Sequence, residues 1–148
     1  MIDISTYILT VGGGVLVFVF CECIKEIWLM PLQEYKKIKS RVSYTLAMYA
    51  NLYYNPIPYE QPANKIPDNY EQASIELRKL ASELGAFIET LSWVKPSIPK
   101  KGNLYDASSN LFALSSGLFV LKNVDMYEYI EYNGKREERI YTLLKIRK

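Results

Sequence analysis

The amino-terminal stretch Ile4–Cys21, ISTYILTVGGGVLVFVFC, decides how the rest of the chain is interpreted. It holds eighteen consecutive residues without a charged side chain, between Asp3 and Glu22. At about 1.5 Å per residue, a helix of that length spans roughly 27 Å, close to the thickness of the hydrocarbon core of a bilayer. Its second half, VLVFVF at residues 15–20, is apolar on every face, unlike an amphipathic surface helix. The sequence therefore predicts a transmembrane anchor helix.

A cleaved signal peptide and a buried core helix are the two other interpretations of this segment. A signal peptide begins with basic residues and ends at a cleavage site of small residues. Residues 1–3 carry no basic side chain, and residues 22–30 contain no Ala-x-Ala pattern. We therefore predict two domains: a transmembrane anchor with an interfacial end over residues 1–30, and a helical domain over residues 31–148.

The charges on either side of the apolar segment predict its orientation. Only Asp3 is charged before it, whereas a run of basic side chains follows it: Lys25, Lys36, Lys37, Lys39 and Arg41. Basic residues that flank a span stay on the cytoplasmic side. We therefore expect a single-pass protein of the bacterial inner membrane, with the amino terminus outside and the carboxy-terminal domain in the cytoplasm. Trp28 would then lie at the level of the lipid headgroups as an interfacial anchor.

Two features of the apolar segment are candidates for function. Gly12, Gly13 and Gly14 lower helix propensity but allow two helices to approach closely, so we interpret them as span-packing residues. A tolerated flexible patch is the alternative. Glu22 and Lys25 follow the segment, where a ring of chains would place their charges at the mouth of a pore. Ordinary interfacial charge is the alternative for this pair.

Composition excludes most catalytic and metal sites. The 148 residues include no histidine, which removes Ser–His and Cys–His nucleophiles and the usual general base at neutral pH. Two cysteines, Cys21 and Cys23, are too few for a four-thiolate metal site or a disulfide framework. They suit either palmitoylation beside a membrane or burial as small thiols. We expect no enzyme, no cofactor, no metal and no small-molecule substrate.

The remaining sequence shows the three- and four-residue apolar spacing of amphipathic helices. The first such helix follows Pro31 and ends at Asn55-Pro56, and four prolines within residues 54–67 predict an extended connection. The second begins at Asp68, with Glu71 completing a capping box. The apolar stripes of these two helices are Leu32, Tyr35, Ile38, Val42, Leu46, Tyr49 and Leu52, and then Tyr70, Ala73, Leu77, Leu80, Leu84, Phe87, Ile88 and Leu91.

The carboxy-terminal third predicts two more helices. Asn103 or Asp106 opens the third, and its stripe is Leu104, Ala107, Leu111, Leu114 and Leu118. The last segment is ambiguous, because residues 127–132 alternate and Asn133-Gly134 is a hairpin-turn signal, whereas apolar spacing from Met126 to Leu144 fits a helix. We expect a helix interrupted near Gly134. The fold class is then all-α: one amino-terminal transmembrane helix followed by a four-helix cytoplasmic bundle.

Two stretches carry a family resemblance: residues 27–35, IWLMPLQEY, and residues 49–56, YANLYYNP. They are similar to stretches of bacterial membrane-anchored proteins. The whole architecture resembles the small membrane accessory proteins found beside RNA-targeting type VI CRISPR systems, which form a divergent HEPN-like helical bundle. That resemblance implies a ring-shaped membrane pore that supports anti-phage defence. HEPN nucleases carry Arg-x4-6-His, and a chain without histidine departs from that pattern, so a non-nuclease form is implied.

The sequence-based hypothesis for function is a homo-oligomeric membrane protein whose spans form a pore or a membrane-perturbing ring. Its expected partners are the lipid bilayer and further copies of the same chain. The alternative is a membrane-anchored interaction module that recruits a soluble partner and forms no pore. A net charge of +2 gives little support to a nucleic-acid partner, although the carboxy-terminal residues 145–148 include three basic side chains.

Overall fold

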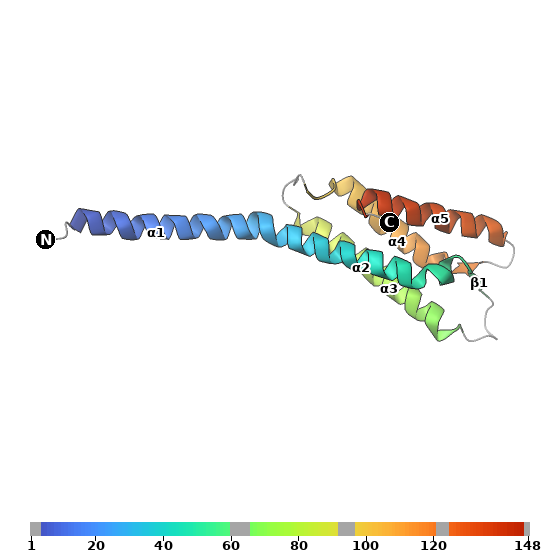
Figure 1. The fold of residues 1–148 in the computed structure, drawn as a ribbon. Coiled ribbons are helices and arrows are strands. Elements are labelled where there is room, and N and C mark those ends of the chain that lie inside the picture. Colours follow the sequence, from blue (N-terminus) through green and yellow to red (C-terminus); the bar gives the residue numbers. More distant parts are fainter. Residues whose placement is uncertain (1–3, 60–65, 92–96, 121–124, 147–148) are drawn as a thin grey trace. The chain divides into compact units, whose positions relative to one another are not determined.

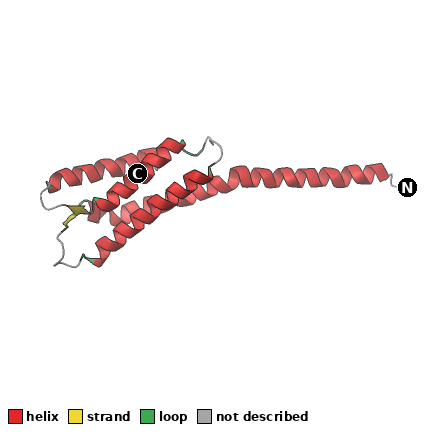
Figure 2. Ribbon diagram, turned by 180° about the vertical axis from the view of Figure 1, so that it is seen from behind, coloured by secondary structure: helices red, strands yellow, loops and turns green. Residues whose placement is uncertain are grey.

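The structure is a computed structural model that describes residues 4–59, 66–91, 97–120 and 125–146, with side chains from Thr10 onward. Helices form most of the described chain (Figures 1 and 2). The elements in chain order are α1 (Ile4–Ile24), η1 (Lys25–Leu29), α2 (Met30–Tyr53), β1 (Ile57–Pro58), α3 (Asp68–Thr90), α4 (Lys101–Ser116), β2 (Phe119–Val120) and α5 (Met126–Leu143). The predicted all-α fold class is confirmed.

Two compact units make up the chain, Met1–Glu34 and Tyr35–Lys148. The first unit holds α1, η1 and the beginning of α2. In the part of the chain that the structure describes, no helix combines the length and the apolar character that crossing a bilayer requires. The transmembrane assignment of residues 1–30 therefore lacks structural support. Asp3, on which the predicted orientation also relies, lies outside the described residues.

Pro31 explains why the helical ladder changes its spacing between α1 and α2. A proline has no N–H to donate, and its ring clashes with the carbonyl four residues before it. The chain widens into the π-helical turn η1 just ahead of Pro31, and the Met30 N–H donates to the Lys25 carbonyl, five residues back. Pro31 then lies in the first turn of α2, where a missing N–H is tolerated. The sequence predicted that this helix follows Pro31, and it begins one residue earlier, at Met30.

The second unit is a bundle of the four helices α2, α3, α4 and α5, which run alternately up and down (Figure 1). Their predicted apolar stripes form the core. The stripe residues of α3 and α4 are buried except for the half-buried Tyr70. In α2 the stripe is buried from Tyr35 to Tyr49, with Leu32 and Leu52 half-buried. The predicted four-helix bundle is therefore confirmed for the described residues.

A short parallel pair of strands ties the end of α2 to the end of α4. Ile57 pairs with Phe119, and the Ile57 N–H donates to the Leu118 carbonyl at 3.0 Å. The Tyr59 N–H donates to the Val120 carbonyl at 2.8 Å. The prolines of residues 54–67 predicted an extended segment here, but its partner strand has no comparable signal in the sequence.

The predicted start of the second helix at Asp68 is confirmed, but its capping box does not form, and the predicted start of the third helix is wrong by a few residues. The residue that precedes α3 is Pro67, so Asp68 is the first helical residue rather than the cap of a capping box. Asp68 and Glu71 both lie in the first turn, where negative charge favours the helix dipole. The helix α4 begins at Lys101, before Asn103 or Asp106, because the Leu104 N–H already donates to the Lys100 carbonyl at 3.2 Å.

The expected interruption of the last helix near Gly134 is also wrong, and the alternative hairpin does not form. The helix α5 runs unbroken through Asn133 and Gly134. Asn133 is fully buried, and its side-chain amide donates at 2.8 Å to two carbonyls, those of Tyr53 and Gly117. Because these bonds satisfy the amide within the bundle, the local turn preference of Asn-Gly is overridden.

Candidate functional site

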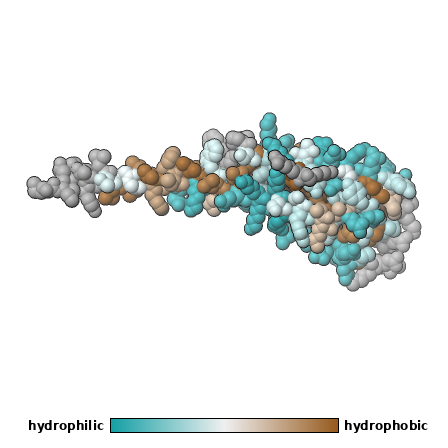
Figure 3. All heavy atoms as spheres, in the orientation of Figure 1, coloured by the Kyte–Doolittle hydropathy of each residue, from teal (hydrophilic) through white to brown (hydrophobic). Residues whose placement is uncertain are grey.

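The exposed apolar surface of α1 is the most unusual feature of the first unit. Side chains at Val11 and at residues 15–20 are between 50% and 72% exposed. Six consecutive exposed residues cover more than one and a half turns, so no face of this helix is sheltered. Figure 3 shows the resulting hydrophobic patch over the described part of α1. Apolar surface of this extent marks a site of contact with lipid or with another protein.

The predicted span-packing residues lie in the middle of α1 with open space around them. A Cβ atom added at Gly12, Gly13 or Gly14 would meet no heavy atom within 4 Å. Three adjacent glycines therefore leave almost a full turn of the helix without side chains, so its backbone is accessible there. Small residues of this kind allow the backbone of a second helix to approach closely.

The two predicted pore-mouth residues pair with each other. The Lys25 ammonium lies 3.3 Å from a Glu22 carboxylate oxygen, one helical turn away. Both side chains are exposed, and an exposed ion pair of this kind contributes about 0.2–1 kcal/mol. The pair neutralises its own charge, so it adds little net field at the end of α1.

The predicted interfacial anchor Trp28 lies in the π-helical turn η1 and is 57% exposed. Ile27, Leu29 and Met30 beside it are also exposed. These four residues, at positions 27–30, thus continue the exposed apolar surface past the Glu22–Lys25 pair. The widened turn was not predicted from the sequence, although Pro31 is a signal for it. Turns of this kind occur often at functional sites.

The cysteines are accessible rather than buried. Cys21 and Cys23 are both free and exposed, which removes the interpretation as small buried thiols. Two residues apart on a helix, they face different directions. Among the described residues, histidine, cysteine and acidic side chains form no group suited to a metal ion.

Comparison with protein-family models, with curated proteins and with solved structures finds no match to this chain. The resemblance to the CRISPR-associated membrane proteins therefore stays a prediction.

Proposed function

We propose that this protein is a membrane-anchored helical bundle, in which α1 inserts into a lipid bilayer and residues 35–148 form the domain that it anchors. The observation that carries this proposal is the exposure of apolar side chains on all faces of α1. Burying seven such side chains in lipid, at about 1.5 kcal/mol each, gives a favourable transfer of roughly 10 kcal/mol. The uncharged run of residues 4–21, of which the first six side chains lie outside the described part, also supports insertion.

Membrane retention of the full chain tests this proposal. Membranes from expressing cells are washed at high salt and then in alkaline carbonate, and the chain is expected to stay in the pellet. The double variant Leu16→Glu, Phe18→Glu places two charges in α1 at about 2.5 kcal/mol or more each and should release it. Its matched control, Ile75→Glu with Phe112→Glu, changes exposed apolar residues of the bundle and should stay bound. Equal release of both variants, or a wild-type chain in the wash, would refute the proposal.

The proposed orientation keeps the bundle in the cytoplasm of a bacterium, with the amino terminus across the inner membrane. The basic residues of α2 support it, because they lie within twenty residues after the end of the apolar segment: Lys36, Lys37, Lys39 and Arg41. A reporter that folds only in the cytoplasm, fused to the carboxy terminus, should be active. Activity of a reporter that folds only outside the cytoplasm would reverse the assignment.

A second candidate function is self-association of α1 into a ring or pore. Its specific support is the bare backbone at Gly12, Gly13 and Gly14, because small residues allow membrane helices to pack closely. Mass in detergent, measured by light scattering, distinguishes the two candidates. A closed oligomer that Gly13→Leu disrupts and that Gly102→Leu leaves intact would favour a ring. A monomer or dimer would favour the interaction module, which recruits a soluble partner without forming a pore.

Anti-phage defence is the biological role that we propose with the ring, and it rests on the family resemblance alone. Expression of the wild-type chain beside an RNA-targeting CRISPR effector should then strengthen protection against phage. The Gly13→Leu variant should lose that gain. No catalytic residue is part of either proposal, because a chain without histidine lacks the nuclease pattern.

A further inference from the structure

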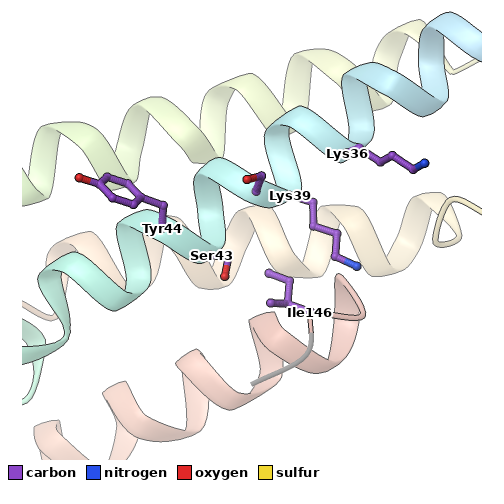
Figure 4. Close-up of a pocket in the computed structure, with 6 residues that line it drawn as sticks. Lys36, Lys39, Ser43, Tyr44 and Ile146 are labelled. Carbon is purple, nitrogen blue, oxygen red and sulfur yellow. The ribbon is translucent and has the colours of Figure 1, made fainter.

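A shallow pocket of 510 Å³ opens between α2 and the chain that follows α5. Residues of α2 three and four positions apart share one face of the helix, and here they supply Lys36, Lys39, Ser40 and Ser43. Tyr44 and Ile146 complete the lining. Figure 4 shows Lys39 and Ser43 directed toward Ile146, with Lys36 and Tyr44 spreading outward on either side. The pocket therefore presents cationic and hydroxyl groups beside apolar ones.

A residue in the left-handed backbone conformation, just after α5, places one wall of this pocket. Lys145 has a φ of 53°, an uncommon conformation outside glycine. It reverses the chain so that the Ile146 N–H donates to the Tyr141 carbonyl at 2.9 Å. The Lys145 carbonyl then accepts a hydrogen bond from the Lys39 ammonium. An ammonium has three donors, so Lys39 is held in place with two donors left for a ligand.

Among the residues that the structure describes, no carboxylate pairs with the two lysines of the pocket. From Tyr35 to Tyr53 the helix α2 carries four basic residues and no acidic one. Arg41 pairs with a carboxylate of α3, whereas Lys36 and Lys39 form no ion pair with any described carboxylate. Two neighbouring lysines that no described carboxylate neutralises attract an anion from outside.

We propose that this pocket binds the phosphate group of an anionic phospholipid. Ammonium and hydroxyl donors suit phosphate oxygens, and the side chains of Ile146 and Tyr44 suit the glycerol and upper acyl carbons of a lipid. Lys36 lies only six positions after Met30, a length of chain that spans at most about 22 Å. Basic residues this close in sequence to a membrane segment meet the anionic surface of the cytoplasmic leaflet. The inference rests on the proposed membrane anchoring.

Lysine acetylation of the full chain in lipid nanodiscs, followed by mass spectrometry, measures occupancy of the pocket residue by residue. One set of discs contains phosphatidylcholine alone, and the other contains added phosphatidylglycerol. We expect acetylation of Lys36 and Lys39 to slow about fivefold in the anionic discs. Lys79 and Lys101, which are exposed on α3 and α4, serve as internal references and should change less than twofold.

Two serine variants separate a defined pocket from a diffuse surface potential, because neither alters charge. Ser43→Ala removes a pocket hydroxyl and should reduce the protection of Lys36 and Lys39 to about twofold. Ser82→Ala removes an exposed hydroxyl of α3 and should leave the fivefold protection unchanged. If Lys36 and Lys39 kept the full fivefold protection from acetylation in both variants, binding of the phosphate in this pocket would be refuted.

The source of the phosphate is decided by adding inorganic phosphate to the phosphatidylcholine discs. Protection of Lys36 and Lys39 by millimolar inorganic phosphate alone would overturn the assignment to a lipid. Equal acetylation in both kinds of disc would overturn binding altogether. Failure of the proposed anchoring has a different signature, because the chain would then not enter neutral discs at all.

Discussion

Replacement of Gly117 by alanine tests how tightly the bundle closes around Asn133. Gly117 follows the last residue of α4 and has a φ of −69°, so any residue could adopt its backbone conformation. The constraint is space. An added Cβ would lie 2.2 Å from Asn133 Oδ1, a distance that real Cβ atoms do not show, and 3.1 Å from an Arg136 guanidinium nitrogen, which is a tight contact.

The expected loss of stability follows from what must move. Asn133 cannot shift without weakening its 2.8 Å hydrogen bonds to the Tyr53 and Gly117 carbonyls. Overpacking costs about 1–3 kcal/mol and a lost hydrogen bond about 1 kcal/mol more. Replacing a glycine whose φ other residues can adopt raises the free energy of unfolding by about 0.4–1 kcal/mol, because the unfolded chain then has less conformational entropy. We therefore expect Gly117→Ala to lower the free energy of unfolding by about 2 kcal/mol.

Urea unfolding of the full chain in mild detergent, followed by far-ultraviolet circular dichroism, measures this loss. Gly102→Ala is the matched control, since no heavy atom lies within 4 Å of its added Cβ. The control should gain about 0.4–1 kcal/mol. A Gly117→Ala protein as stable as wild type, or one that gains stability like the control, would refute the reasoning.

A double-mutant cycle assigns the cause of the loss. In an Asn133→Ala background the clashing side-chain oxygen is gone, so Gly117→Ala should cost at least about 1 kcal/mol less than in wild type. Equal penalties in both backgrounds would place the clash elsewhere, at Arg136.

Three variants of the bundle and the dependence of its stability on pH give further expected outcomes. Tyr35→Phe should lower the free energy of unfolding by about 1 kcal/mol, measured with urea, because it removes a 2.7 Å hydrogen bond to the buried Leu144 carbonyl. Tyr49→Phe should leave the free energy of unfolding unchanged or raise it, because the buried Tyr49 hydroxyl has no hydrogen-bond partner among the described residues. Burial raises the pKa of Tyr35 to about 12, from 10.0, and a hydrogen bond to a carboxylate of α5, followed by burial, raises that of Tyr54 to about 12. The unfolded chain loses these protons first, so the stability that these two tyrosines contribute should be constant below pH 10 and fall between pH 10 and about 12. The fall should be smaller in Tyr35→Phe, as read from urea midpoints across that range. Lys145→Gly should raise the free energy of unfolding by about 0.5 kcal/mol, because glycine adopts the left-handed conformation without strain; an unchanged midpoint would show that its side chain compensates for the strain.

The sequence by itself determined the helices and most of the core. Apolar residues spaced by three and four identify the buried face of a helix wherever that helix packs, so stripe residues such as Leu77, Leu84 and Leu111 could be read directly. The uncharged run at the amino terminus likewise determined that α1 has no polar face. Both properties depend only on neighbours within a few turns of the same helix.

Only the tertiary structure decided that Asn133 and Gly134 are part of a helix and that the basic pocket forms. Asn133 stays helical because the carbonyl of Tyr53, eighty residues earlier, accepts its amide. The pocket exists because Lys145 turns the chain back toward Lys39, 106 residues earlier. No local pattern encodes such pairings, since the partners are remote in sequence and their distance depends on how the four helices pack.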